Sequence, residues 1–198
     1  MKIISVFLSV LTLVACTSVQ TTTRVSTSLR AQEYNSVASR YLEQPTFVEM
    51  ATLNDGTQLL IVDMKLYAVP SFYSGLRASG AAAEALRHSR IGFGKNQVTG
   101  YVAAIDKFLE WATLASERKD AFTKEISSVP TGRGALKFTF HSGNDRSHFL
   151  AVAWSAMGTT IDEKAQYFDI SNAKELKRLL LAFASDSIQR TNIDSIYK

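Results

Sequence analysis

The turn segment Asn54-Asp55-Gly56 is the feature that most restricts what this chain can fold into. It separates two segments with the composition of β-strands, residues 47–53 and 58–67. Asn, Asp and Gly tolerate the positive φ angles that tight hairpin turns require, so we predict a β-hairpin here. Because the middle of the second segment is apolar on both faces, we expect that strand to be central in a sheet.

Four further strands are predicted in the second half of the chain, over residues 121–129, 135–141, 147–156 and 166–170. The clearest is residues 135–141, where apolar and polar side chains alternate along the segment. Turn residues follow the first strand at 130–132 and the second at 142–146. Such short connections favour antiparallel pairing of neighbouring strands.

Two helices complete the predicted fold. Residues 98–118 carry apolar side chains at spacings of three and four, which is typical of an amphipathic helix. A second pattern of the same kind covers residues 172–184, with Ser171 as the predicted N-cap. The order of elements favours an α+β domain, in which an antiparallel sheet built from hairpins has two amphipathic helices packed on one face.

The start of the chain has a different character. Lys2 gives it a positive charge, residues 3–14 form an almost unbroken apolar run, and the small residue Ala15 precedes Cys16. A charged start, an apolar stretch and a small residue at a cleavage site together predict a secretory signal peptide. The apolar run is too short to span a bilayer, which needs about 20 residues.

The end of this segment, Leu13-Val14-Ala15-Cys16, resembles the lipobox of bacterial lipoproteins. The resemblance implies cleavage before Cys16, transfer of a diacylglycerol to its sulfur, and acylation of the freed amine. It also implies that Thr17, the residue after the cysteine, permits export to the outer membrane. The anchor would then be effectively permanent, because each buried CH₂ of the acyl chains contributes about 0.8 kcal/mol.

The resulting domain plan has three parts. Residues 1–15 are the signal peptide, residues 16–32 are the lipidated cysteine with a flexible tether rich in Thr and Ser, and residues 33–198 form a single α+β domain. The tether has no apolar periodicity and is expected to remain unordered. Within the domain, residues 33–42 are expected to form a short amphipathic helix or an irregular arm that ends at Pro45.

Composition excludes several functional classes. Cys16 is the only cysteine, so the mature domain has no disulfide, no cysteine-based metal cage and no thiol nucleophile. Lys2 is the only charged residue of the predicted signal peptide, so its removal lowers the net charge from +4 to +3. That excess is too small and dispersed to indicate nucleic-acid binding. No catalytic sequence motif occurs, and we expect a non-catalytic domain without a cofactor other than the covalent lipid.

The segment 68–95 is the predicted contact surface for a protein partner. It is longer than a connection needs, and aromatic and basic side chains of the kind that interfaces favour gather in it. The alternative interpretation is a basic, solvated loop that covers one edge of the sheet. The candidate contact residues are Phe72, Tyr73, Arg77, Arg87, Arg90, Phe93 and Lys95.

His141 and His148 are the one weak candidate for a metal site. If the turn between them keeps four residues, the two imidazoles face each other with Cβ atoms about 5 Å apart. Asp145 is the nearest additional ligand in sequence. The alternative is a pair of solvated histidines at a hairpin end, and it is favoured because zinc sites use at least three protein ligands.

Two functions of different class are consistent with these features. The first is an outer-membrane lipoprotein whose domain binds a protein partner or supports an envelope assembly. We expect this domain on the periplasmic face in preference to the cell surface. The second is an envelope protein that binds a small molecule or lipid in a pocket between the sheet and the helices. An enzyme is the third hypothesis, and the sequence supports it least.

Overall fold

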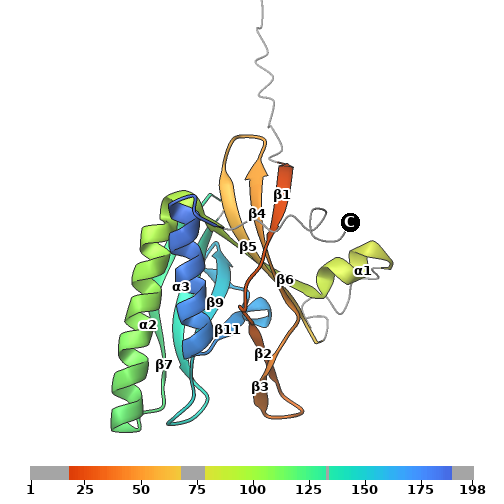
Figure 1. The fold of residues 1–198 in the computed structure, drawn as a ribbon. Helices are drawn as coiled ribbons and strands as arrows, with labels where there is room; N and C mark the ends of the chain where they lie inside the picture. The colour runs from red at the N-terminus through yellow and green to blue at the C-terminus, as the bar shows by residue number, and fades with distance from the viewer. Residues whose placement is uncertain (1–17, 68–78, 133, 189–198) are drawn as a thin grey trace, which may run out of the picture.

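The structure is a computed structural model that describes residues 18–67, 79–132 and 134–188 (Figure 1). Most of its elements are antiparallel strands, and helices accompany them, so the predicted α+β class is confirmed. The prediction of one sheet is wrong, because the strands form two separate sheets. No helix within the described ranges is both long and apolar enough to cross a membrane.

The four-stranded sheet has the strand order β1-β4-β5-β6, and all neighbours are antiparallel. β4 and β5 form the predicted hairpin, and Gly56 in its turn has a φ of 82°. β5 lies between two partners, as its apolar composition predicted. The bounds of the strands are β1 Val19–Val25, β4 Thr46–Leu53, β5 Gln58–Lys65 and β6 His88–Gly94.

The seven-stranded sheet has the order β3-β2-β11-β9-β8-β7, and β10 pairs with β9. The late strand β11 lies between the early strand β2 and β9, so distant parts of the chain meet in the middle of this sheet. The bounds are β2 Gln32–Asn35, β3 Arg40–Glu43, β7 Thr123–Thr131, β8 Gly134–Ser142, β9 His148–Ala156, β10 Thr159–Thr160 and β11 Gln166–Phe168.

Helices α2 (Val98–Arg118) and α3 (Ile170–Ala184) lie side by side against the seven-stranded sheet (Figure 1). α2 is the one long helix, with 21 residues over the predicted range, and α1 (Ala81–Leu86) is short. The predicted cap of α3 at Ser171 is wrong. Asp169 is the N-cap, because its carboxylate accepts a hydrogen bond from the backbone N–H of Asn172.

The core fills the space between the helices and the two sheets. Phe138 and Phe140 of β8 and Phe108 of α2 are fully buried. Phe93 of the four-stranded sheet packs edge-on against Tyr101 of α2, with ring centroids 5.2 Å apart. Both sheets therefore share one apolar core with α2.

The predicted flexible tether over residues 16–32 is wrong for the part that the structure describes. Residues 19–25 are β1, which pairs with β4 along its length, and Leu29 and Ala31 are fully buried. The stretch from Thr21 to Thr23 has no apolar periodicity, but its backbone hydrogen bonds are supplied by β4. An edge strand of this kind needs a partner in space rather than an apolar pattern of its own.

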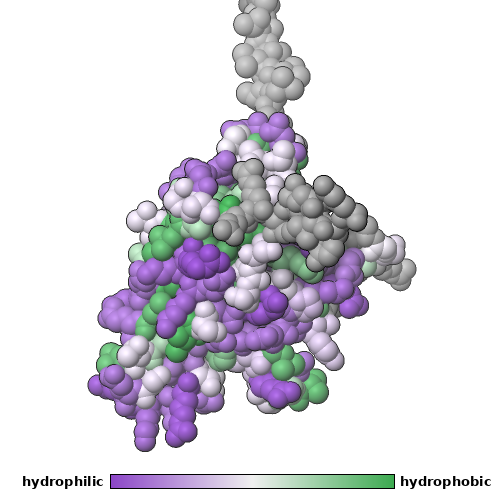
Figure 2. All heavy atoms as spheres, in the orientation of Figure 1, coloured by the Kyte–Doolittle hydropathy of each residue, from purple (hydrophilic) through white to green (hydrophobic). Residues whose placement is uncertain are grey.

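The prediction of a helix or irregular arm over residues 33–42 is also wrong. This stretch is the β2–β3 hairpin, in which Tyr34 pairs with Tyr41. The spacing of its apolar residues fits a helix, but the same residues form a two-stranded ladder once β11 pairs with β2. Figure 2 shows hydrophobic residues at the tip of this hairpin, where Val37 is 91% exposed.

Candidate functional site

A cavity of about 600 Å³ lies on the face of the seven-stranded sheet opposite the helices, between the β2–β3 and β8–β9 turns. We call it the tyrosine cleft. Five ring side chains form its floor and one wall: Tyr34, Tyr41, His141, Phe149 and Tyr167. Short polar residues and one arginine line it from the two turns: Ser39, Arg40, Ser142, Gly143, Asn144 and Ser147.

Strand register brings these rings to one face. His141 of β8 is directly opposite Phe149 of β9, and Tyr34 is opposite Tyr41 across the hairpin. Tyr167 belongs to β11, which lies between these two pairs. Directly paired residues of neighbouring strands point to the same side of a sheet, so five residues from five strands form one surface.

Tyr41 is the centre of this ring cluster. Its centroid lies 4.1 Å from that of Phe149, 4.9 Å from that of Tyr167 and 5.2 Å from that of Tyr34. The edge of His141 packs on it at 5.7 Å. These separations are those of interacting aromatic pairs. Each ring of the floor therefore packs against at least one other ring.

Burial controls the protonation of the cleft. It raises the pKa of Tyr41, and the neighbouring phenols of Tyr167 and Tyr34 raise it further. Burial also raises the pKa of Tyr167, with Asp162 as a smaller cause. Burial lowers the pKa of His141. Near neutral pH the two phenols therefore keep their protons and remain hydrogen-bond donors, and the imidazole is mainly uncharged.

Ser142 and His148 form a hydrogen-bonded pair at the edge of the cleft. Ser142 Oγ lies 3.0 Å from His148 Nδ1, and the pKa of His148 is lowered by burial, against a smaller opposing effect of Asp145. A serine nucleophile needs a histidine that a carboxylate orients and stabilises when charged. The Nε2 atom of His148 instead has no hydrogen-bond partner in the described structure, and the ring stacks on Phe140. The pair is therefore poorly suited to catalysis.

The predicted pairing of His141 with His148 is wrong by one residue. His148 is opposite Ser142, and His141 is opposite Phe149. The two histidines consequently point to opposite sides of the sheet and cannot share a metal ion. No group of three or more potential metal ligands occurs within the described ranges.

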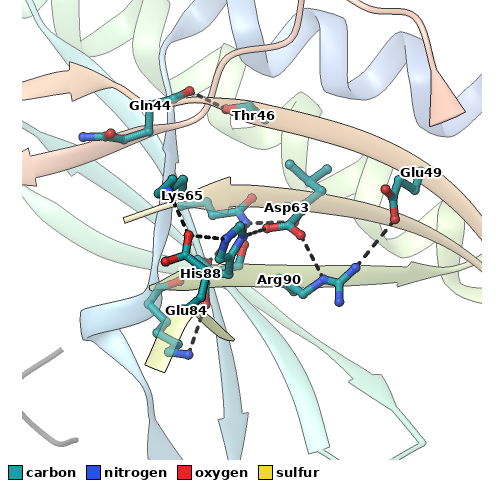
Figure 3. Close-up of polar contacts among 12 residues, drawn as sticks. Gln44, Thr46, Glu49, Asp63, Lys65, Glu84, His88 and Arg90 are labelled. Atoms are coloured by element: carbon teal, nitrogen blue, oxygen red, sulfur yellow. Dashed lines mark hydrogen bonds and ion pairs between the residues drawn. The ribbon is translucent and has the colours of Figure 1, made fainter. Parts of the chain in front are cut away.

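The outer surface of the four-stranded sheet carries a network of ion pairs (Figure 3). Asp63 lies at its centre, with Oδ1 2.6 Å from His88 Nδ1 and Oδ2 3.0 Å from Arg90 Nε. Glu84 of α1 joins it, 2.8 Å from the ammonium group of Lys65. These side chains satisfy one another, so the network stabilises the surface and the position of α1 rather than offering free groups to a ligand.

The predicted contact surface over residues 68–95 does not form as a unit in the described part. Phe93 is fully buried in the core, so its assignment to a contact surface is wrong. Arg90 is used in the ion-pair network, and Lys95 pairs with Asp186 and donates to Gln58 at 3.0 Å. Residues 88–94 are strand β6 rather than loop, because β5 supplies a partner for every one of them.

The remaining predicted contact residues have separate positions. Arg87 is exposed at the C-terminal end of α1. Phe72, Tyr73 and Arg77 lie outside the described residues, and their role stays a prediction. Of the five rings that gather at the tyrosine cleft, only His141 was a predicted candidate, for a metal site, and the other four were missed. Tyr34 and Tyr41 could have indicated a hairpin with paired aromatic residues.

A second cavity, of about 560 Å³, lies at the other end of the domain. The β4–β5 turn lines it through Asp55 and Thr57, and the rest of the wall includes Leu136 and Trp154. Trp154 is 37% exposed there. The β4–β5 turn also lies beside the point where the described chain begins, since Ser18 N donates to Asn54 Oδ1 at 3.2 Å.

No protein-family model, curated protein or solved structure matches this chain.

Proposed function

We propose that the protein is an outer-membrane lipoprotein, acylated on Cys16, whose non-catalytic domain binds a protein partner through the tyrosine cleft. The observation that carries this proposal is the position of the cleft. The β2–β3 hairpin, whose residues line the cleft, lies at the end of the domain opposite the β4–β5 turn (Figure 1). Ser18, where the chain leaves toward the proposed anchor, lies beside that turn.

The distance between anchor and domain is short in this proposal. Cys16 precedes Ser18 by two residues, and a chain advances at most about 3.6 Å per residue. The acylated residue is then within about 7 Å of Ser18 and of the β4–β5 turn beside it. With that turn near the bilayer, the cleft faces away from the membrane, where a partner from the envelope can reach it.

The chemistry of the cleft supports protein binding. Tyr and Arg are enriched at protein interfaces, and Ser, Gly and Asn provide adaptable hydrogen bonds in binding loops. The tyrosine cleft combines three tyrosines with Arg40 and with Ser, Gly and Asn residues of the β8–β9 turn. Tyr34 is 48% exposed at its edge, so a partner can cover it.

The alternative of a ligand pocket between sheet and helices has less support. The residues that α2 and α3 turn toward the sheet are buried in one core, including Phe108 and Leu176. The two cavities described above lie elsewhere, on the outer face of the seven-stranded sheet and at the β4–β5 turn.

The anchor and the cleft are tested separately in living bacteria. Metabolic labelling with a fatty-acid analogue is expected to mark the wild-type protein and to leave Cys16→Ser unlabelled and unprocessed, because the thiol is the acyl acceptor. Equal label in both proteins would refute the anchor.

For the cleft, a photo-crosslinking amino acid replaces Tyr34, and in a control it replaces Leu114, which is 52% exposed on the outer side of α2. We expect a covalent product with one protein from position 34 and none from position 114. Absence of a product at 34, at normal expression and lipidation, would contradict partner binding at the cleft.

A further inference from the structure

The tyrosine cleft offers several side-chain groups that can donate a hydrogen bond to a ligand. The hydroxyls of Tyr34, Tyr41 and Tyr167 have no hydrogen-bond partner among the described residues, and these three side chains line the cavity. His141 Nδ1 lies 2.9 Å from Thr123 Oγ1, which leaves its Nε2 atom for a ligand. The half-buried phenols of Tyr41 and Tyr167 keep their protons, so each presents an O–H group to a ligand that enters the cleft.

Arg40 is the only charged residue among those that line the cleft. Within the described ranges its guanidinium forms no ion pair, in contrast to Arg24 and Arg90, which face Glu49, and to Arg178, which pairs with Glu175. A guanidinium offers a planar set of donors that matches a carboxylate in a bidentate geometry. The cleft therefore combines an uncompensated positive charge with a floor of hydroxyl donors and apolar ring surface.

We infer that the partner places an acidic peptide segment in the tyrosine cleft, with a side-chain carboxylate paired to Arg40 and backbone carbonyls accepting hydrogen bonds from the three tyrosine hydroxyls. This inference rests on the proposed function and names the chemistry of its partner. An extended peptide suits the site because it supplies carbonyl acceptors at regular spacing and apolar side chains that can contact the rings. Charge complementarity favours an acidic sequence over a neutral or basic one.

The test measures binding of two labelled hexapeptides to the purified, lipidated full-length protein by fluorescence anisotropy. One probe alternates Glu with Leu, and the other has Gln in place of every Glu, so the two differ in charge and not in shape. We expect the acidic probe to bind about tenfold more tightly than the Gln probe, which corresponds to one charge-assisted contact. Raising the salt concentration should weaken the acidic probe alone.

Arg40→Gln is expected to reduce the affinity of the acidic probe to that of the Gln probe. Arg146→Gln is the matched control, because Arg146 is exposed in the β8–β9 turn and does not line the cleft. It should change the affinity less than twofold. Tyr34→Phe is expected to weaken both probes to a similar degree, since it removes a donor without a charge.

Three results would overturn the inference: equal binding of the two probes, no binding of either, or equal effects of Arg40→Gln and Arg146→Gln. A muropeptide carrying a disaccharide and a tetrapeptide is a third probe. If it alone binds in an Arg40-dependent way, the occupant is the cell wall and not a protein. If a protein is cross-linked from position 34 but Arg40→Gln leaves that product unchanged, the proposed function stands and the acidic-peptide inference fails.

Discussion

His148 shows how a single buried side chain links stability to pH. His148 is 3% exposed, and its ring stacks on that of Phe140. Its Nε2 atom has no hydrogen-bond partner among the described residues. Charging such a ring inside the core is unfavourable, which is why burial lowers its pKa. A histidine with a lowered folded-state pKa binds its proton more readily in the unfolded chain. Its contribution to stability is therefore complete above about pH 6.5 and is lost as pH falls below that value.

We expect the free energy of unfolding to fall between pH 8 and pH 5, and part of this fall to disappear in the double variant His141→Asn/His148→Asn. Burial lowers the pKa of both histidines, so both act in the same direction. Glu33, whose pKa is raised by burial, acts in the opposite direction and is unchanged in the variant. Urea unfolding at several pH values measures the difference.

His88→Asn provides the control for that experiment, since it leaves the rings of His141 and His148 in place. A double variant whose stability depends on pH as steeply as that of the wild type would contradict this account of the two imidazoles.

Phe108 is a core side chain whose truncation should destabilise the fold. It is fully buried on α2, with its ring centroid 5.8 Å from that of Phe140. Phe108→Ala should lower the free energy of unfolding by about 3–5 kcal/mol, because it removes apolar contacts and leaves a cavity. Leu114→Ala on the exposed side of the same helix should cost far less. Comparable losses in the two variants, measured by urea unfolding, would show that the buried side of α2 is misassigned.

At the scale of elements, the sequence predicts those whose pattern is local. The β4–β5 hairpin and α2 were predicted within one or two residues, since a turn signal or a long apolar stripe defines each of them. β8 and β9 were also predicted, but their register was wrong by one residue, because the turn length decides it. Because of this one-residue error, the pairing of His141 with Phe149, which forms one part of the cleft, was not predicted.

The elements that sequence alone did not predict depend on distant partners. β1 obtains its backbone hydrogen bonds from β4. β2 pairs with its hairpin neighbour β3 and also with β11, which lies more than a hundred residues later and joins the hairpin to the sheet. Without its partner, the Thr-rich segment of β1 has no pattern that distinguishes a strand from a loop, and the apolar spacing around β2 fits a helix. Sequence analysis could therefore not group four of the five cleft rings into a site, because they meet only when β2, β3 and β11 lie beside β9.

The status of β1 as a strand leads to a prediction about truncation. A chain that begins at residue 27 lacks β1, which leaves β4 as an unprotected edge and exposes the apolar residues that Val25 covers. We expect a lower unfolding midpoint and concentration-dependent association compared with a chain that begins at residue 18. Urea unfolding and sedimentation velocity measure the two effects. A flexible tether would instead give identical midpoints and a monomer in both cases.

At the scale of the whole molecule, the proposed function makes the domain a short spacer between a membrane and a partner. The β4–β5 turn lies at one end and the β8–β9 turn at the other, separated along the direction of α2 (Figure 1). A helix of 21 residues alone is about 31 Å long. An anchor within about 7 Å of Ser18 gives the domain little freedom to turn over. The tyrosine cleft is then held away from the bilayer by the length of the sheet.

This orientation can be measured because Cys16 is the only cysteine, and in the proposed lipoprotein the acyl group consumes its thiol. A cysteine introduced as Asp55→Cys or Asn144→Cys is then the one free thiol for a fluorescent dye. In vesicles that contain an acceptor lipid, energy transfer should be strong from position 55, in the β4–β5 turn, and weak from position 144, beside the cleft. Inserting ten Gly and Ser residues after Thr17 should reduce the contrast, since a longer flexible connection lets the domain rotate. Equal transfer from both positions without the insertion would mean that the domain lies flat on the membrane, with the cleft as close to the lipid as the β4–β5 turn.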